Sequence, residues 1–468
     1  MMAEIIPTIL SGGFGSRLWP LSRRERPKQF LPIFQGESLF QKTVSRTSGS
    51  QFTSPLIISN QDHRFLVGEQ LAQMEVEPLA VVLEPVGRNT AAPAALASIF
   101  ALEKNEDALI LLLPSDHLIG DEAAFNAAIA EGVSAAKSGQ IVTFGIRPSE
   151  PHTGYGYIKI KDASGKGAVP VEAFVEKPSL EKAERFLEVG GYLWNAGIFL
   201  FSAQTMKEAF KQHAPEIWSG VEAAYKAAKQ DLDFLRLDEE LFKQVPSDSI
   251  DYAIMEKEKQ VACVPMEPKW SDLGSWTAIW ENMEKDASGN TALAETGFID
   301  SRNCLVYSDD AYVAVLGLDD VMVVNTKDAL LVASKSHAQD VKKVVETLDA
   351  QKRSETVKHR RVYRPWGWTE QIAKGDRFQV QSIAIKPDRG MSIQRHIHRA
   401  EHWIVVSGTL KVIIDGVSKL VTENQSVFVP LGATHQLFNP GKIEVRMIEV
   451  QSGAYIADDD IEREGMNN

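Results

Sequence analysis

The sequence predicts an α/β protein that ends in a separate all-β barrel. In the first half, short apolar runs alternate with amphipathic segments, which is typical of strands and helices in a sheet covered on both faces. In the last hundred or so residues, short strand-like segments lie between glycine and proline turns with almost no helical periodicity. The chain has 468 residues, too many for one ordinary core, so we expect more than one domain.

The first domain is expected to span residues 1–285. Strands are predicted at 5–10, 56–59, 80–83, 108–113 and 141–144, in a mostly parallel arrangement with helices at 90–102 and 122–137. Further strands are predicted at 156–160, 172–176, 198–201 and 261–266, with helices at 180–187, 203–212 and 276–283.

A region of different character follows at 286–355. Its β segments, at 304–308, 311–316 and 321–325, lie between Asp, Gly and Asn turns, and a helix is expected at 338–348. The polar run 351–361 is the best linker candidate, and the all-β domain is expected at 356–468.

The charge of the chain argues against nucleic acid and membranes as partners. The formal net charge is -13, so the surface as a whole repels polyanions, and an anionic ligand needs a local basic pocket. The two cysteines, Cys263 and Cys304, have no metal-type spacing and do not suggest a disulfide framework. Since no leader or membrane span is evident, we expect a cytoplasmic protein.

A glycine-rich loop follows the first predicted strand, in Ser11-Gly-Gly-Phe-Gly-Ser-Arg-Leu-Trp-Pro20. It lacks the Gly-Lys-Ser/Thr end of a Walker A loop, and Leu18 stands where a dinucleotide fingerprint needs glycine. Glycines let backbone N–H groups approach phosphate oxygens, and Arg17 and Lys28 could then neutralise charge on a leaving phosphate. The alternative is a glycine turn beside a solvated basic face.

The loop and seven later segments resemble the sugar nucleotidyltransferases, and more narrowly the mannose-1-phosphate guanylyltransferases. The first of these segments is Leu10-Ser-Gly-Gly-Phe-Gly-Ser-Arg-Leu-Trp-Pro-Leu-Ser22 with Pro27-Lys-Gln-Phe-Leu31. The others, in order, are Glu84-Pro-Val-Gly-Arg-Asn-Thr-Ala91, Pro114-Ser-Asp-His117, Gly154-Tyr-Gly-Tyr-Ile158, Phe174-Val-Glu-Lys-Pro178, Trp194-Asn-Ala-Gly-Ile-Phe199, Ser249-Ile-Asp-Tyr-Ala-Ile-Met-Glu256 and Trp270-Ser-Asp-Leu-Gly-Ser-Trp276. The resemblance implies a Rossmann-like mixed sheet and transfer of GMP from GTP to mannose 1-phosphate.

The resemblance also implies a role for each segment. Asp116 and Asp272 would hold Mg2+, and Arg17 and Lys28 would stabilise charge on the departing diphosphate. The nucleotide would be bound by Gly12, Gly13, Gly15, Ser16, Glu84, Gly87, Asn89 and Thr90. The sugar phosphate would be bound by Gly154, Glu176, Lys177 and Asn195. An ion pair with the neighbouring Glu176 is the alternative for Lys177.

Four of the ten histidines lie between residues 396 and 435 of the predicted barrel, at positions 396, 398, 402 and 435. If 394–398 is a strand, His396 and His398 share a face, which suits a metal inside the barrel. The segment resembles a cupin, whose ligands would be His396, His398, Glu401 and His435. Because the acid falls one residue earlier than usual, His402 or Gln394 could replace Glu401, and a metal-free barrel is a further alternative.

The segment Gln394-Arg-His-Ile-His-Arg-Ala-Glu-His-Trp-Ile-Val-Val-Ser-Gly408 further resembles the type II phosphomannose isomerases that are fused to bacterial guanylyltransferases. This resemblance implies Zn2+ or a similar ion, interconversion of fructose 6-phosphate and mannose 6-phosphate, and a charge-holding role for Arg399. Arg463 is a further candidate, although the end of the chain lacks the family's Tyr-Gly-Arg. The alternative is a monofunctional guanylyltransferase with an inactive or dimerising cupin. Expected partners are GTP, mannose 1-phosphate, GDP-mannose and mannose 6-phosphate, and a homodimer is considered.

Overall fold

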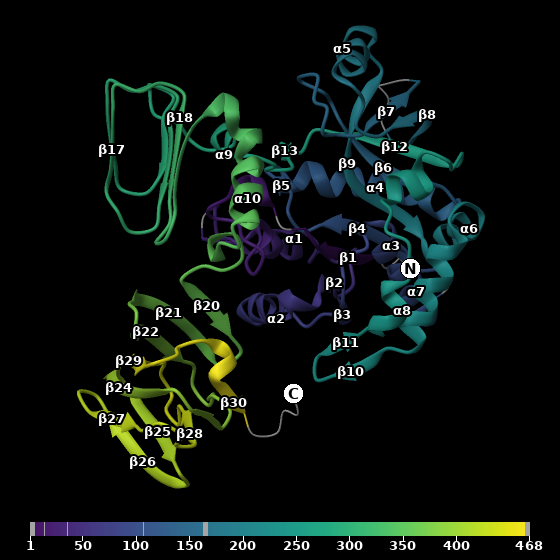
Figure 1. The fold of residues 1–468 in the computed structure, drawn as a ribbon. Helices are drawn as coiled ribbons and strands as arrows, with labels where there is room; N and C mark the ends of the chain where they lie inside the picture. Colours follow the sequence, from purple (N-terminus) through teal and green to yellow (C-terminus); the bar gives the residue numbers. More distant parts are fainter. Residues whose placement is uncertain (1–4, 14, 35, 106, 162–166, 464–468) are drawn as a thin grey trace. The chain divides into compact units, whose positions relative to one another are not determined.

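The computed structural model describes residues 5–13, 15–34, 36–105, 107–161 and 167–463, which form two compact units (Figure 1). The first unit comprises Met1–Val324 and Leu331–Ala350, and the second comprises Asn325–Leu330 and Gln351–Asn468. Among the described residues, no helix combines the length and apolar character needed to cross a bilayer.

An eleven-stranded mixed sheet forms the centre of the first unit. Strand β1 (Ile5–Ser11) pairs in parallel with β2 (Leu56–Asn60) and β4 (Leu109–Pro114), as expected from their continuous apolar character. The long strand β9 (Tyr192–Ser202) runs antiparallel to both β4 and β6 (Ile141–Ile146), so the second half of the sheet mixes antiparallel and parallel pairs. The sheet order is β10 (Lys229–Asp231), β11 (Phe234–Arg236), β3 (Ala80–Glu84), β2, β1, β4, β9, β6, β12 (Val261–Met266), β8 (Val169–Val175) and β7 (Tyr157–Ile160).

Helices cover both faces of this sheet (Figure 1). Helix α3 (Ala91–Lys104) is buried along most of its length because its small alanines allow close packing on β1, β4 and the neighbouring helices. Helix α1 (Leu39–Arg46) begins with a capping box formed by Ser38 and Gln41. The remaining helices of the sheet domain are α2 (Arg64–Gln73), α4 (Glu122–Lys137), α5 (Leu180–Val189), α6 (Ala203–His213), α7 (Pro215–Lys226), α8 (Glu239–Lys243) and α9 (Trp276–Glu281).

Short parallel strands follow, wound into a small coil (Figure 1). Its core contains Cys304, Val306 and Val315, and helix α10 (Val341–Ala350) comes after it. The strands are β14 (Thr291–Leu293), β15 (Thr296–Ile299), β16 (Leu305–Ser308), β17 (Val313–Leu316), β18 (Val321–Asn325) and β19 (Leu330–Ser334).

The second unit is the predicted all-β barrel, built from two antiparallel sheets. Buried apolar residues of the barrel strands, among them Ile383, Trp403 and Leu437, form its core. One sheet has the order β20 (Arg361–Arg364), β21 (Gly367–Lys374), β22 (Phe378–Ile385), β29 (Val445–Gly453), β24 (Arg399–Ser407) and β27 (Ser426–Val429). The other has the order β26 (Val417–Thr422), β25 (Thr409–Ile414), β28 (His435–Phe438), β23 (Gln394–His396) and β30 (Ile461–Arg463).

Candidate active sites

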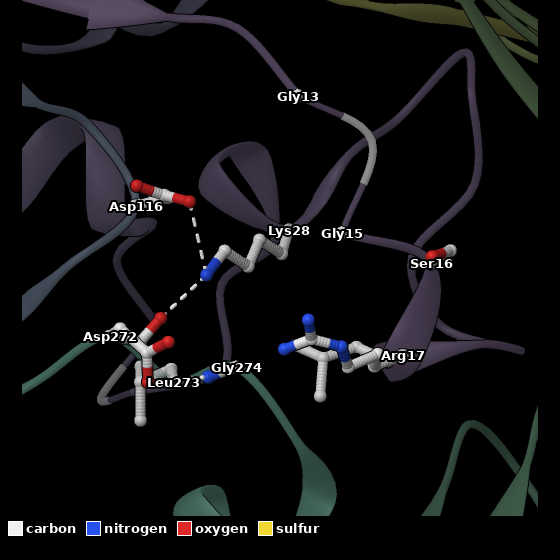
Figure 2. A pocket seen from close by; sticks show the side chains of 10 residues that line it. Gly13, Gly15, Ser16, Arg17, Lys28, Asp116, Asp272, Leu273 and Gly274 are labelled. Atoms are coloured by element: carbon white, nitrogen blue, oxygen red, sulfur yellow. Dashed lines mark hydrogen bonds and ion pairs between the residues drawn. The ribbon is translucent and has the colours of Figure 1, made fainter. Parts of the chain in front are cut away.

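A pocket of about 250 Å³ lies at the carboxyl ends of β1 and β4, where open α/β sheets bind ligands (Figure 2). Its walls come from the glycine loop with Lys28, from the segment that contains Asp116 and from the segment that contains Asp272. The lining residues are Gly13, Gly15, Ser16, Arg17, Leu18, Lys28, Asp116, Asp272, Leu273 and Gly274. Glycine backbone, two cations and two carboxylates therefore meet in one cavity.

The glycine loop is shaped by residues of the following motif. Gly13 and Gly15 have φ values of 85° and 56°, a region that favours glycine. A Cβ atom on Gly15 would lie 3.0 Å from Cγ of Lys28, so the glycine makes room for the lysine. The buried Gln29 amide donates to the carbonyl oxygens of Gly12 at 3.3 Å and Gly13 at 3.5 Å. Gln29 was not among the predicted site residues, although it lies beside Lys28 in the quoted motif.

Lys28 connects the two aspartates. Its Nζ lies 3.0 Å from Oδ2 of Asp116 and donates to the backbone oxygen of Asp272 at 2.6 Å (Figure 2). Burial acts to raise the pKa of Asp116, but the charges of Lys28 and His117 outweigh it and the pKa is lowered. Asp116 is therefore held as a carboxylate in the pocket.

Two very short strands bring the distant aspartates together. Strand β5 (Leu118–Ile119) follows Asp116 and pairs antiparallel with β13 (Trp270–Ser271), which precedes Asp272. The Asp272 oxygen Oδ1 accepts from the Tyr155 hydroxyl at 2.8 Å and from the Gly274 N–H at 3.0 Å. Two carboxylates in the lining of one pocket are the oxygen donors that a hard divalent cation prefers.

Arg17 is exposed and lines the same pocket. Within the described part of the chain, its guanidinium forms no hydrogen bond or ion pair. It also lines a neighbouring cavity of about 860 Å³, which shares Asp272 and Gly274 with the first and extends past Tyr155 and Trp194. A phosphate in the smaller pocket would thus lie next to a space large enough for a sugar.

The predicted sugar contacts form a second cluster. The Asn195 oxygen accepts from the Thr143 hydroxyl at 2.9 Å and from the Gly197 N–H at 3.1 Å. Lys177 adopts a φ of 45° and pairs with Glu176 at 2.8 Å, which is the alternative considered for this lysine. Glu176 is almost fully buried as a side chain, at 8% exposure, whereas Lys177 is 59% exposed.

Gly154 lines the larger cavity beside Tyr155 and Trp194, and Gly156 lies closer to the sugar cluster. A Cβ on Gly156 would meet Oε2 of Glu176 at 2.5 Å and Cβ of Asn195 at 3.3 Å, whereas one on Gly154 would meet only His152. Gly156 also accepts the Asn195 N–H at 2.8 Å. Gly156 therefore packs against Glu176 and Asn195, whereas Gly154 lies in the turn that precedes it.

Asp251 is a member of this cluster that sequence reasoning missed. Its Oδ1 accepts from the Asn195 amide nitrogen at 3.0 Å, so both ends of that amide are fixed. Burial, and then the nearby charge of Glu176, raise the pKa of Asp251 to about 7. Asp251 begins a π-helical turn (Asp251–Met255), a local geometry frequent at functional sites. Its presence in one of the family-like segments was the available signal.

The predicted base-binding segment begins at Glu84, the last residue of β3. Glu84 is 8% exposed, and its Oε1 has no hydrogen-bond partner among the described residues. Burial raises the pKa of Glu84 to about 8. Farther along, Asn89 has a φ of 60° and the Thr90 hydroxyl accepts from the Ile250 N–H at 3.0 Å, while Gly87 has open space around its Cα.

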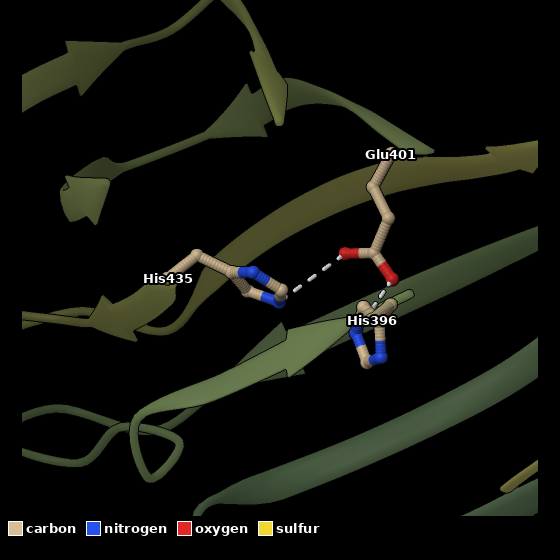
Figure 3. Close-up of side chains that lie close together, drawn as sticks. All are labelled: His396, Glu401 and His435. Atoms are coloured by element: carbon tan, nitrogen blue, oxygen red, sulfur yellow. Dashed lines mark ion pairs between the residues drawn. The ribbon is translucent and has the colours of Figure 1, made fainter. Parts of the chain in front are cut away.

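In the barrel, His396, Glu401 and His435 converge in the interior (Figure 3). Nε2 of His396 lies 3.1 Å from Oε1 of Glu401, and Nε2 of His435 lies 3.7 Å from Oε2 of the same residue. All three are buried, and one ligand atom from each lies within 4.8 Å of the others. Burial acts to raise the pKa of Glu401, but His396, His435 and Arg399 hold it at about 2. Two imidazoles and one carboxylate could hold a divalent metal.

His398 lies outside this group, contrary to the prediction. Strand β23 ends at His396 and the chain bends over the next two residues, so the alternation that placed His398 on the same face does not continue. Its side chain is 57% exposed and pairs with Asp460 at 2.8 Å.

The alternatives to Glu401 also separate. His402 points outward against the Phe428 ring, at a centroid distance of 4.7 Å. Gln394 does reach the group, with Nε2 3.4 Å from Nε2 of His435.

Arg399 is part of the barrel interior rather than the surface. Its Nε lies 3.3 Å from Oε1 of Glu401, and another nitrogen donates to the Ala457 carbonyl at 2.9 Å. The side chain is only 4% exposed. Arg463, in contrast, lies on strand β30, where it pairs with Gln394 in the backbone register and its side chain is exposed.

Three protein-family models match successive parts of the chain. Residues 6–289 match the nucleotidyl transferase family, 297–348 match the MannoseP isomerase/GMP-like beta-helix domain, and 351–465 match the mannose-6-phosphate isomerase C-terminal family. The chain is 48% identical to the alginate biosynthesis protein AlgA of Pseudomonas aeruginosa, covering 98% of this chain and 96% of that protein. It is 46% identical to the mannose-1-phosphate guanylyltransferase of Escherichia coli, covering 98% of both.

Two solved structures are similar to more than half of the chain. A Thermus thermophilus protein described as mannose-1-phosphate geranyltransferase is 34% identical with a TM-score of 0.67, over 74% of this chain and 99% of that one. A mannose-6-phosphate isomerase from Helicobacter pylori is 32% identical with a TM-score of 0.51, over 57% of this chain and 99% of that one. With the full-length relatives, these matches show that the chain belongs to the mannose-1-phosphate guanylyltransferase family whose members carry a C-terminal mannose-6-phosphate isomerase domain.

Proposed function

We propose that the first unit transfers GMP from GTP to mannose 1-phosphate, which yields GDP-mannose and diphosphate, and that the barrel interconverts fructose 6-phosphate and mannose 6-phosphate. The observation that carries the first activity is the meeting of Lys28, Asp116 and Asp272 in the pocket that Arg17 lines.

The attacking oxygen in this reaction belongs to a phosphate that is already anionic, so a general base is not required. The work of the chain is to position two polyanions and to hold charge on the departing diphosphate. Arg17, exposed in the pocket, and Lys28, almost buried beside Asp116, are the cations suited to this task. The glycine loop offers backbone N–H groups to the triphosphate. Asp116 and Asp272 would hold Mg2+, which when bound supplies further neutralisation of phosphate charge.

Specificity for guanine is assigned to Glu84. Guanine presents two neighbouring donors, N1–H and the exocyclic amino group, and a carboxylate can accept from both. The unpartnered Oε1 of Glu84 supports this assignment, since a buried acceptor without a donor is costly until a ligand supplies one. Thr90 and Asn89 would shape the loop that follows.

The sugar phosphate is assigned to Gly154, Glu176, Lys177 and Asn195, with the backbone of Gly156 packed beside them. Glu176 can accept from a sugar hydroxyl and the fixed Asn195 amide can donate to one, while the exposed Lys177 ammonium can bind phosphate after leaving Glu176. On binding mannose 1-phosphate, Lys177 would thus exchange its ion pair with Glu176 for an ion pair with the phosphate.

In the barrel, His396, Glu401 and His435 would hold Zn2+ or another divalent transition metal, and Gln394 lies close enough to assist. When bound, such an ion polarises a sugar carbonyl. Arg399, whose guanidinium lies beside Glu401 and His396, would hold negative charge on the sugar as a proton moves between C1 and C2.

We also place the enzyme in the cytoplasm. Both cysteines are free and buried, which supports a reducing compartment.

One preparation tested in two assays distinguishes a bifunctional enzyme from a guanylyltransferase with an inactive barrel. GTP and mannose 1-phosphate are supplied in one assay, and mannose 6-phosphate in the other, with GDP-mannose and fructose 6-phosphate measured. We expect turnover in both, and bound transition metal by elemental analysis. Turnover in the first assay alone, with a metal-free barrel, would leave only the guanylyltransferase.

A further inference from the structure

Tyr155 connects the phosphate pocket to an aromatic cluster that no function described above uses. Its hydroxyl donates to Oδ1 of Asp272 at 2.8 Å, and the Gly274 N–H donates to the same oxygen at 3.0 Å. A Cβ on Gly274 would lie 2.6 Å from the other oxygen, Oδ2, so the glycine gives that oxygen room. One oxygen of Asp272 is therefore fixed by two donors, and the other is left for a different partner.

The Tyr155 ring is itself held by several neighbours. It stacks on His152 at a centroid distance of 3.8 Å and meets the edges of Trp194 at 5.1 Å and Trp270 at 5.3 Å. Aromatic pairs at these distances and angles stabilise a defined arrangement. The hydroxyl therefore reaches Asp272 from a rigid base rather than from a mobile side chain.

The same cluster supports the second carboxylate. The indole Nε1 of Trp270 donates to Nδ1 of His117 at 3.2 Å, with the two rings edge to face at 5.3 Å. Nε2 of that imidazole lies 3.8 Å from Oδ1 of Asp116. One aromatic wall (His117, His152, Tyr155, Trp194 and Trp270) thus lies behind both aspartates.

We propose that Tyr155 is a positioning residue for divalent metal binding, which orients the Asp272 carboxylate so that Oδ2 faces the cation. This inference rests on the proposed function, because it takes Asp116 and Asp272 as the cation's protein ligands. Groups that hydrogen-bond to a ligand fix its orientation, and their loss typically lowers metal affinity or activity about 10–100-fold.

The test measures Mn2+ binding to the full chain by isothermal calorimetry. All variants carry His435→Ala, which removes the barrel cluster so that one class of site is counted. Tyr155→Phe keeps the ring and removes only the donor, and we expect Mn2+ affinity to fall about 10–100-fold. Tyr225→Phe is the matched control, because the Tyr225 hydroxyl donates to Glu103 and neither residue lines the phosphate pocket. The Mn2+ affinity of this variant should equal that of the parent.

A second readout separates positioning from substrate contact. In Tyr155→Phe, the Mg2+ concentration that gives half-maximal guanylyltransfer should rise, while KM for mannose 1-phosphate at saturating Mg2+ should change less than twofold. Parental Mn2+ affinity in Tyr155→Phe would overturn the proposal, and so would a raised KM for mannose 1-phosphate with unchanged Mn2+ affinity. Melting temperatures of both tyrosine variants confirm folding.

A third variant distinguishes failure of this inference from failure of the proposed function. Asp272→Asn removes one ligand charge and should lose more Mn2+ affinity than Tyr155→Phe. If Asp272→Asn binds Mn2+ as well as the parent, the assignment of the metal ligands is wrong. If Asp272→Asn loses binding and Tyr155→Phe keeps it, only the role of Tyr155 is wrong.

Discussion

The ammonium group of Lys28 lies 3.0 Å from the carboxylate of Asp116, with the lysine side chain 9% exposed. A buried cation in contact with a proposed metal ligand links the glycine-loop motif to the strand β4 motif. Removal of Lys28 should therefore damage guanylyltransfer and leave isomerisation unaffected.

Lys28→Ala should reduce guanylyltransfer about 100- to 1000-fold, as expected when a fixed group that stabilises developing charge is lost. Arg17→Ala should have an effect of similar size. Isomerisation of mannose 6-phosphate by the same preparations provides the internal control and should be unchanged. Near-parental GDP-mannose synthesis by either variant would contradict the role of these cations.

Affinity for GTP should depend on pH through Glu84. Its pKa of about 8 means that much of the free protein holds a proton on this carboxyl at neutral pH. The two donors of guanine require the ionised form, so KM for GTP should fall as the pH rises from about 6.5 to 8.5. Glu84→Gln should bind GTP more weakly and lose this dependence. If KM for GTP changed with pH in the same way in wild type and Glu84→Gln, the role of Glu84 in binding guanine would be refuted.

The same residue should also affect stability. The pKa of Glu84 is higher in the folded protein than in the unfolded chain, so the folded protein holds this proton more tightly. The resulting stabilisation of the fold is complete below the pKa of the unfolded chain and is lost as the pH rises toward 8. The unfolding free energy of wild type should therefore decrease relative to Glu84→Gln between about pH 5 and 9, by a few kcal/mol at most, since one pKa unit corresponds to about 1.4 kcal/mol. Denaturant titrations at several pH values measure this difference, and a difference that stays constant with pH would contradict it.

Asp251 should control the sugar site by fixing the Asn195 amide. Asp251→Ala should raise KM for mannose 1-phosphate about tenfold, the effect of about 1.4 kcal/mol, and leave KM for GTP unchanged. Asp251→Asn retains an oxygen acceptor for Asn195 and should restore most of the loss. Equal changes in both KM values would instead indicate a general structural defect.

His396→Ala should abolish isomerisation and lower the content of bound transition metal, because it removes one of three converging ligands. Guanylyltransfer should remain. His402→Ala is the matched control, since this histidine is exposed beside Phe428, and it should affect neither activity. Full isomerase activity in His396→Ala would show that the cluster is not the catalytic centre.

The sequence was most informative where the pattern is local. Continuous apolar runs identified β1, β4 and β12, and the alanine-rich segment identified α3, because burial on both faces leaves a strong signal. The antiparallel placement of β9 was not predictable, since pairing direction leaves no trace in the periodicity of a single strand.

The candidate sites show the same limit. The resemblance named Asp116 and Asp272, but the two-residue strands β5 and β13 that bring them together are too short to carry a pattern. His398 was misplaced because strand alternation was extended across a bend, and Gly156, two residues after the predicted Gly154, was not singled out. Asp251 and Gln29 act through other site residues, and such roles depend on contacts between segments.

The close approach of Gly15 to Lys28 changes how a substitution at that glycine would act. Any side chain there would press on Cγ of the lysine, 3.0 Å from the position of the new carbon. The consequence would be a displaced positive charge, not a blocked entrance, so a purely steric change in the loop would produce an electrostatic defect across the pocket. Variation at Gly15 should therefore be tolerated only with compensating variation at Lys28.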